Sequence, residues 1–245
     1  MSSSWFYAYP QLEAGLLVKR YKRFFADIEL DSGSLITAHC PNTGPMTGVC
    51  QVGSRVLVSR SLNPKRKLAY TWEAIEVNDS QPTWVGINTA LPNRVVRAAL
   101  EANLWPQLEP YTAIKAEVPY GRDRKSRIDF LLLNELDPAG MPTYVEVKNT
   151  TWAQGKQALF PDTVTTRGQK HLRELTALPP DARAVMLYFI NRGDCLEFSP
   201  GDSADPAYGQ LLRLAIAAGV EVLPCRFEIT PVGIAYQGLA KLKLP

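Results

Sequence analysis

The apolar run at residues 184–190, Ala-Val-Met-Leu-Tyr-Phe-Ile, is the feature that most limits the fold of this chain. Side chains of a strand point alternately to its two faces, so a run without polar residues predicts a strand covered on both sides. Arg183 and Asn191 bound the run, which is far too short to cross a bilayer. We therefore expect a buried, central strand of a sheet.

Helices and strands are expected on both sides of this run. Asn93 is expected to cap a first helix, and Gly219 to close the last one. The expected helices cover residues 94–105, 163–177 and 206–218, and the expected strands 114–119, 127–133, 144–148 and 220–229. This order, with residues 184–190 between the last two helices, is typical of a mixed α/β domain.

The segment before Pro92 has a different pattern. Short segments rich in β-branched and aromatic residues are separated by turns such as Asp31-Ser32-Gly33-Ser34. Strands are expected within residues 16–30, 35–39, 53–59, 68–77 and 84–88. Several short strands in so small a segment suggest a small barrel such as an OB-fold. We expect an OB-like domain over residues 1–88 and a mixed α/β domain over residues 89–245.

Positive charge is concentrated near the N-terminus. Residues 16–72 contain nine lysines and arginines and three acidic residues, whereas the whole chain has a net charge of +3. Such a surface favours an anionic partner, or it is an ordinary solvated face. Aromatic residues alternate with these cations, either to stack on bases or to form the barrel core. The cations proposed to bind nucleic acid are Arg20, Lys22, Arg23, Lys65, Arg66 and Lys67.

The four cysteines form no C-x-x-C pair, and the chain has two histidines, a composition that does not favour a structural zinc site. The N-terminal residues lack the charged start and apolar core of a signal peptide. We therefore expect reduced cysteines and a cytoplasmic location, with association with the nucleoid as an option.

Residues 127–133 and 144–148 carry the candidate chemistry. Asp129 lies on an apolar strand, where an ionised group is costly unless it is paired or binds a cation. On the next expected strand Glu146 and Lys148 share a face. A hairpin would bring the carboxylates of Asp129 and Glu146 to one divalent ion, with Lys148 beside it. Mg²⁺ or Mn²⁺ is the expected cofactor; the alternative is a set of structural ion pairs on a half-exposed sheet.

An aspartate followed by Glu-x-Lys in this order of elements resembles the PD-(D/E)XK nuclease superfamily. The chain is more closely similar to the sugar fermentation stimulation protein A family. The resemblance rests on these segments: R-Y-K-R-F-F-A-D at 20–27, H-C-P-N-T-G at 39–44, S-R-I-D-F at 126–130, Y-V-E-V-K at 144–148 and F-P-D-T-V-T-T-R-G-Q-K-H-L at 160–172. Ile128 stands where the superfamily has its leading proline.

The resemblance implies an OB-like domain joined to a nuclease-like domain, non-specific DNA binding and a regulatory role in sugar (maltose) metabolism. The superfamily often adds a glutamate from the first helix, for which Glu101 is the candidate; Glu117 is the alternative third carboxylate. Further candidates for holding nucleic acid or phosphate are Arg127, Arg167, Gln169, Lys170 and His171. Two hypotheses stay open: a Mg²⁺- or Mn²⁺-dependent nuclease, acting on single- or double-stranded DNA, and a non-catalytic DNA-binding factor.

Overall fold

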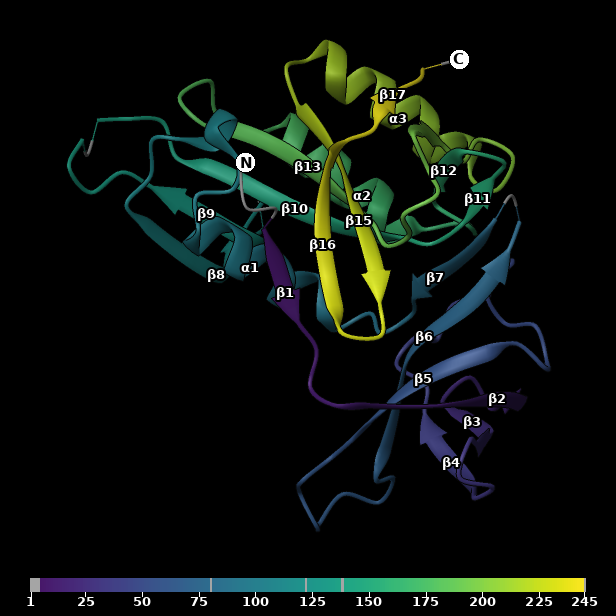
Figure 1. Ribbon diagram of the computed structural model, residues 1–245. Helices are drawn as coiled ribbons and strands as arrows, with labels where there is room; N and C mark the ends of the chain where they lie inside the picture. Colours follow the sequence, from purple (N-terminus) through teal and green to yellow (C-terminus); the bar gives the residue numbers. More distant parts are fainter. Residues whose placement is uncertain (1–4, 80, 122, 138, 245) are drawn as a thin grey trace.

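The N-terminal part of the chain forms a five-stranded barrel in the computed structural model, which describes residues 5–79, 81–121, 123–137 and 139–244 (Figure 1). Its strands are β2 (Leu12–Tyr21), β3 (Phe25–Leu30), β4 (Leu35–His39), β5 (Arg55–Arg60) and β6 (Tyr70–Asn78). Neighbouring strands pair antiparallel in the order β4-β3-β2-β5-β6, and a short parallel pairing of β4 with β6 closes the ring. This is the strand arrangement of an OB-fold, as the turn pattern predicted.

The barrel interior is apolar and fully buried. Leu17, Ile28, Val58 and Trp72 have no exposed surface and belong to one cluster. Trp72 is the largest of them, and its indole N–H donates to the carbonyl of Ala74 at 2.9 Å, so burial leaves no polar atom of this ring unpaired. Of the aromatic residues that were expected either to stack on bases or to fill the core, Trp72 is therefore a core residue.

The C-terminal part contains a six-stranded segment, β7-β15-β13-β10-β9-β8, of the 13-stranded sheet that also includes the barrel strands. Its strands are β7 (Pro82–Gly86), β8 (Ala113–Tyr120), β9 (Ser126–Leu133), β10 (Thr143–Thr150), β13 (Arg183–Ile190) and β15 (Glu221–Thr230). β13 pairs in parallel with β10 and with β15, and the side chains from Ala184 to Ile190 are all buried. The prediction of a buried, central strand is confirmed.

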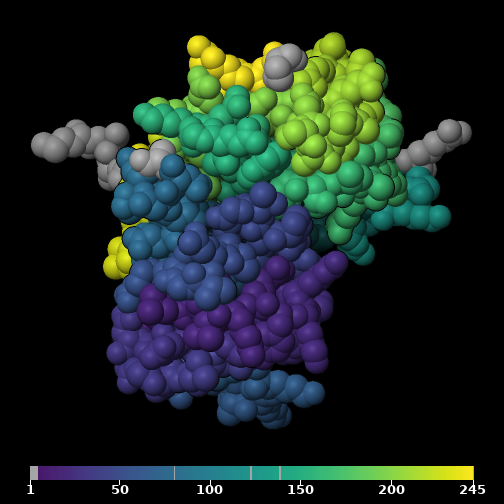
Figure 2. Space-filling model, turned by 90° about the vertical axis from the view of Figure 1, so that its right-hand side faces the viewer, coloured from purple at the N-terminus to yellow at the C-terminus, as the bar shows by residue number. Residues whose placement is uncertain are grey.

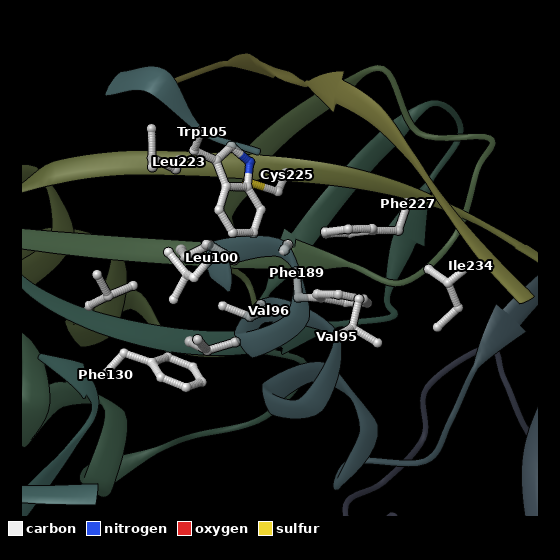
Figure 3. Packing of buried hydrophobic residues seen from close by; sticks show 14 of the residues in the cluster. Val95, Val96, Leu100, Trp105, Phe130, Phe189, Leu223, Cys225, Phe227 and Ile234 are labelled. Atoms are coloured by element: carbon white, nitrogen blue, oxygen red, sulfur yellow. The ribbon is translucent and has the colours of Figure 1, made fainter. Parts of the chain in front are cut away.

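Three helices cover the two faces of this sheet: α1 (Leu91–Glu101), α2 (Thr166–Thr176) and α3 (Pro206–Ala217). Val95, Val96 and Leu100 of α1 pack with Phe130 and Phe189 on one face (Figure 3). Helices α2 and α3 contribute side chains to a different cluster, which includes alternate residues of β13. The helices therefore sandwich the sheet, which explains why β13 is apolar on both sides.

The start of α1 differs from the prediction. The helix begins at Leu91, with Ala90 at its N-cap position and a proline in its first turn. Asn93 was expected to be the cap, but it lies inside the helix and its side chain is used elsewhere. Pro92 was expected to precede the helix, yet proline is favoured in the first turn, where its missing N–H has no intrahelical partner.

Several short elements were not predicted. Strands β11 (Ala153–Gln154), β12 (Gln157–Phe160), β14 (Glu197–Pro200) and β17 (Lys241–Leu242) form a separate four-stranded sheet. Strand β16 (Gly233–Leu239) pairs with β15 and with β1 (Phe6–Ala8), and a single 3₁₀ turn covers Pro106–Leu108. The first strand of the chain therefore joins the C-terminal sheet, although it falls in the range expected for the N-terminal domain.

The two parts of the molecule are in direct contact (Figure 2), and barrel strand β6 pairs with β7. Arg192, which is 1% exposed, follows β13 and donates to both carboxylate oxygens of Asp194 at 2.7 Å. The same guanidinium donates to Asp79, which lies just after β6 of the barrel, at 2.7 Å and to the carbonyl of Thr151 at 3.1 Å. A buried arginine thus joins the barrel to the C-terminal sheet.

Candidate functional site

The candidate site lies where β9 and β10 separate. Their antiparallel pairing joins Thr143, Tyr144 and Val145 to Leu132, Leu131 and Phe130 and ends there. Glu146 and Asp129 are the next residues on the two strands beyond this pairing. The backbone N–H of Val147 donates instead to Asp129 Oδ2 at 2.7 Å, so a side chain takes the place of a strand partner. The splayed strands leave both carboxylates at the opening.

Asp129 is held by groups from two elements. Its Oδ1 accepts a hydrogen bond from Asn93 Nδ2 of α1 at 2.8 Å, while Oδ2 accepts the one from Val147. Burial raises the pKa of Asp129 to about 6 and the nearby charge of Glu146 adds to this rise, against the opposing effects of Val147, Lys148 and Asn93. Asp129 is thus a carboxylate whose charged form is costly in this place, and a cation would stabilise it.

Glu146 is 2% exposed and has two differently placed oxygens. Oε1 accepts from Lys148 Nζ at 2.6 Å and contacts His171 Nδ1 of α2. Oε2 is buried, and within the part of the chain that the structure describes it has no hydrogen-bond partner. Burial raises the pKa of Glu146, but Lys148 and His171 outweigh this effect, so that the net shift is downward.

The groups that contact the Glu146 carboxylate also contact one another and Arg167. Lys148 Nζ lies 3.4 Å from His171 Nδ1, and Arg167 Nε, one helical turn earlier on α2, lies 3.5 Å from His171 Nε2. His171 is 3% exposed, whereas Arg167 is exposed. Of the phosphate-binding candidates on α2, His171 therefore contacts Glu146 and Arg167 lies next to His171.

These residues fit a hard divalent cation. The donor set contains two carboxylates, and Glu146 Oε2 is a buried anionic oxygen that the described side chains leave unpartnered. No group of three or more histidine, cysteine, aspartate or glutamate side chains in the described ranges is placed to hold a metal ion. The remaining ligands would be waters and substrate oxygens, an arrangement that is common for Mg²⁺.

The two alternatives for a third carboxylate lie apart from this arrangement. Glu101 is exposed at the end of α1 and pairs with Arg97 at 2.8 Å, about 12 Å along the helix from Asn93. Glu117 falls opposite Asp129 in the β8–β9 register, but its side chain is exposed and its φ is 53°. Asn93 is the first-helix residue that contacts Asp129, and its interpretation as a helix cap hid this role.

Other candidates on α2 and β9 have structural partners. Gln169 Nε2 donates to Asp205 at 3.0 and 3.1 Å, which links α2 to the start of α3. Lys170 pairs with Glu174 at 3.5 Å, one turn further along α2, and Arg127 is exposed and donates to the carbonyl of Glu117 at 2.9 Å. Gln169 therefore helps to pack two helices.

The barrel cations divide into two kinds. Arg20 donates to the carbonyls of Asn42 and Gly44 at 2.9 and 3.0 Å and so holds the loop after β4. Lys22 and Arg23 are exposed, at φ values of 48° and 63°, in the turn between β2 and β3. The other exposed candidates, in the loop between β5 and β6, are Lys65, Arg66 and Lys67.

Two aromatic side chains accompany these cations. Phe24, next to the β2–β3 turn, is 49% exposed, whereas Tyr21 is half-buried and stacks on Phe25 at 5.4 Å between ring centroids. The exposed ring of Phe24 beside Lys22 and Arg23 suits stacking on a base.

Taken together, the molecule is a barrel of the OB type joined to a restriction-endonuclease-like α/β domain. Two carboxylates and a lysine of that domain lie where strands β9 and β10 separate. Comparison with known proteins identifies the family. The family model of the sugar fermentation stimulation protein RE domain matches residues 90–233. The family model of the SfsA N-terminal OB domain matches residues 18–87. The chain belongs to the sugar fermentation stimulation protein family, as the sequence motifs indicated.

The relatives are similar over their full length. A sugar fermentation stimulation protein homolog of a Cyanothece species is 67% identical over 99% of this chain and 100% of that protein. A homolog of a Nostoc species is 66% identical over 98% of this chain and 99% of its own. The structure of Pyrococcus furiosus SfsA in complex with Ca²⁺ has 25% identity and a TM-score of 0.84 over 97% of this chain and 98% of that one.

The family assignment confirms the predicted fold class, an OB domain followed by a nuclease-like domain. Among the described residues, no helix has the length and apolar character that a bilayer crossing requires.

Proposed function

We propose that this protein binds DNA without sequence specificity and hydrolyses a phosphodiester bond at Asp129, Glu146 and Lys148 with Mg²⁺ or Mn²⁺. In this proposal residues 1–88 hold the nucleic acid and residues 89–245 carry the site. The observation that supports it most is the buried Glu146 carboxylate, which has a lowered pKa and one oxygen without a protein partner among the described residues, close to Asp129. A cation at that oxygen would satisfy both groups.

Asp129 and Glu146 would hold the metal. When bound, a divalent ion lowers the pKa of its water and neutralises charge on the attacked phosphate. Pyrococcus furiosus SfsA forms a complex with Ca²⁺, an oxygen-seeking cation of the same class, and this supports a divalent ion in the family.

Lys148 and the α2 residues act on the phosphate and on Glu146. Lys148 is largely buried, with 13% of its side chain exposed, so its ammonium group can donate to a phosphate oxygen in a water-poor site, where such interactions are strong. His171 fixes Glu146 Oε1, which orients the unpartnered Oε2. Arg167 is exposed beside His171 and can bind the adjacent phosphate of the strand.

The test is cleavage of labelled single- and double-stranded DNA with Mg²⁺ or Mn²⁺. Wild-type protein is expected to cut, and Asp129→Ala and Lys148→Ala to lose at least about 100-fold, the size of a removed charge-stabilising group. Lys156→Ala, an exposed lysine beyond β10, is the matched control and should cut like wild type. Absence of cleavage by wild type, or full cleavage by both variants, refutes hydrolysis.

A non-catalytic DNA-binding factor is the second candidate. Both oxygens of Asp129 already accept hydrogen bonds from the protein, which favours a held carboxylate over an exchanging ligand. This candidate predicts salt-sensitive DNA binding that survives Asp129→Ala, with no cleavage by wild type. A role in sugar metabolism would then follow from binding alone.

A further inference from the structure

A groove beside the candidate site runs between helix α2 and the turn that joins β8 to β9. Its volume is about 1150 Å³, comparable to the larger ligand sites of proteins. Its walls combine apolar side chains with exposed cations: Val118, Tyr144 and Leu178 with Arg124, Lys170 and Arg173. This combination suits a ligand that has both flat apolar surfaces and negative charge.

The groove adjoins the candidate site along two elements. Tyr144 and Glu146 are two residues apart on β10, so their side chains point to the same face of the strand, about 6.6 Å apart along it. On α2, Lys170 immediately precedes His171, which contacts Glu146. A nucleic-acid chain that leaves the Glu146 carboxylate along β10 or α2 therefore meets groove residues next.

Two arginines of the groove are free to attract an anion. The acidic side chains of the groove already have lysine partners: Glu174 lies 3.5 Å from Lys170, and Asp123 lies 3.8 Å from Lys125. Arg124 and Arg173 are exposed, and within the described ranges neither forms an ion pair with an acidic side chain. Their charge is complementary to a phosphate.

The cations of α2 follow one ridge of the helix, which starts at the candidate site. Arg167, whose Nε lies 3.5 Å from His171 Nε2, is followed by Lys170 and Arg173 at intervals of three residues, and all three cations are exposed. The ridge is about 9 Å long at 1.5 Å per residue. Phosphates of a stacked strand succeed one another about every 3.4 Å along its axis, so the ridge spans about three nucleotides.

Tyr144 gives the groove a surface for a base. It is half-buried, and the ring of Tyr120 packs against it at 6.0 Å between centroids with a tilt of 42°, which holds its orientation. Stacking on an aromatic ring suits any base, because every base has a flat face, and it therefore requires no particular sequence. In a duplex these faces are covered by the neighbouring base pairs, whereas in a single strand they are accessible.

We propose that the groove holds the single-stranded DNA segment next to the scissile phosphate, with a base against Tyr144 and phosphates on Arg167 and Arg173. Arg124 binds the same backbone from the opposite wall. The substrate class is then single-stranded DNA, or a duplex with an unpaired end, of any sequence. The inference rests on the proposed function for the place of the scissile phosphate, and it selects between the two substrate classes that the proposed function leaves open.

Binding of the whole protein to oligonucleotides without divalent ions, measured by fluorescence anisotropy, tests the groove without any cleavage. Tyr144→Ala should weaken binding of thymidine and adenosine homo-oligomers by roughly 5- to 100-fold, the contribution of one stacked base, and leave binding of a blunt duplex unchanged. Tyr144→Phe keeps the ring and should bind both like wild type. Unchanged single-strand binding by a folded Tyr144→Ala variant, or an equal loss for single strand and duplex, overturns the inference.

The two arginines provide a second test that leaves the packing of Tyr144 intact. The double variant Arg124→Ala, Arg173→Ala should lower the slope of log K against log salt for single strands by about 1.4, at about 0.7 for each lost phosphate contact. Lys241→Ala removes an exposed cation of β17 and should keep the wild-type slope. A wild-type slope in the double variant refutes the groove as a phosphate track even if Tyr144→Ala does not fold.

Photo-crosslinking of a single strand that contains iodouracil locates the base directly. Mass spectrometry should find the crosslink on Tyr144, and crosslinks to barrel residues alone would contradict the inference. Asp129→Ala should keep the crosslink and the single-strand affinity. Loss of cleavage therefore bears on the proposed function, whereas loss of the crosslink in wild type bears on the groove.

Discussion

The free energy of unfolding of an Asp129→Asn variant tests, independently of catalysis, whether the ionised Asp129 carboxylate destabilises the fold. A rise of the pKa of Asp129 from its ordinary value of 3.8 to about 6 corresponds to about 3 kcal/mol, at 1.36 kcal/mol for each tenfold change in the ionisation constant. The folded state holds the proton more tightly than the unfolded state. Stability from this group is therefore largest below pH 4 and is lost as the pH rises through about 6.

Asparagine has the same shape and no charge. It can still accept from Val147 N–H with its oxygen, while its amide meets Asn93, whose side chain can turn to offer its own oxygen. At pH 7.5 we expect Asp129→Asn to be more stable than wild type by about 1–3 kcal/mol, and the difference to shrink towards zero as the pH falls to 4. Urea unfolding at several pH values measures both effects.

A divalent cation should reverse the order of stability of wild type and Asp129→Asn. Ca²⁺ stabilises whichever protein binds it, by an amount that grows with its concentration over Kd. Wild type should gain stability with Ca²⁺ at pH 7.5, and Asp129→Asn should gain little. Asp181→Asn, in the exposed turn after α2, is the matched control and should follow wild type throughout. A less stable Asp129→Asn variant at pH 7.5, or a difference independent of pH, would refute the assignment of a costly charge to Asp129.

Three other predictions concern the barrel and α2. The double variant Lys22→Ala, Arg23→Ala should weaken DNA binding, and the slope of log K against log salt should fall by about one for each phosphate that is no longer bound; fluorescence anisotropy measures both. Its free energy of unfolding, measured by urea titration, should stay that of wild type. Arg20→Ala should instead destabilise the protein by about 1–3 kcal/mol, because two loop carbonyls lose their donor; an unchanged urea midpoint would contradict this. His171→Ala should raise the pKa of Glu146 and so move the acidic limb of the cleavage–pH profile to higher pH; an unmoved limb argues against the interaction.

Periodicity and turn chemistry predicted the elements that carry their own local signal. The apolar run in β13 is long enough to require cover on both faces, and the turn-separated segments of the barrel have the spacing of short antiparallel strands. Strands β11 and β17 contain two residues each, and β17 pairs with a segment far away along the chain. Nothing within such a segment specifies its partner, so local pattern could not reveal them.

The sequence predicted the charged residues of the candidate site but not the neutral side chain that contacts them. Face alternation brought Glu146 and Lys148 together, and the β9–β10 pairing ends just before Asp129 and Glu146. Asn93 was missed because asparagine beside a proline is also a helix-start signal, and only the packing of α1 on the sheet turns its amide towards Asp129. Gln169 could not be separated from the phosphate-binding candidates, because its partner Asp205 lies 36 residues away.

The charges of the site are a second reason, besides the family resemblance, to expect a bound cation. Glu146 is compensated by Lys148 and His171, and its pKa is lowered, whereas the pKa of Asp129 is raised in part by the charge of Glu146. A purely structural ion-pair cluster would be more stable with a neutral side chain at position 129. Because position 129 carries a carboxylate and Glu146 Oε2 has no hydrogen-bond partner among the described residues, these charges favour a bound divalent ion over a set of structural ion pairs.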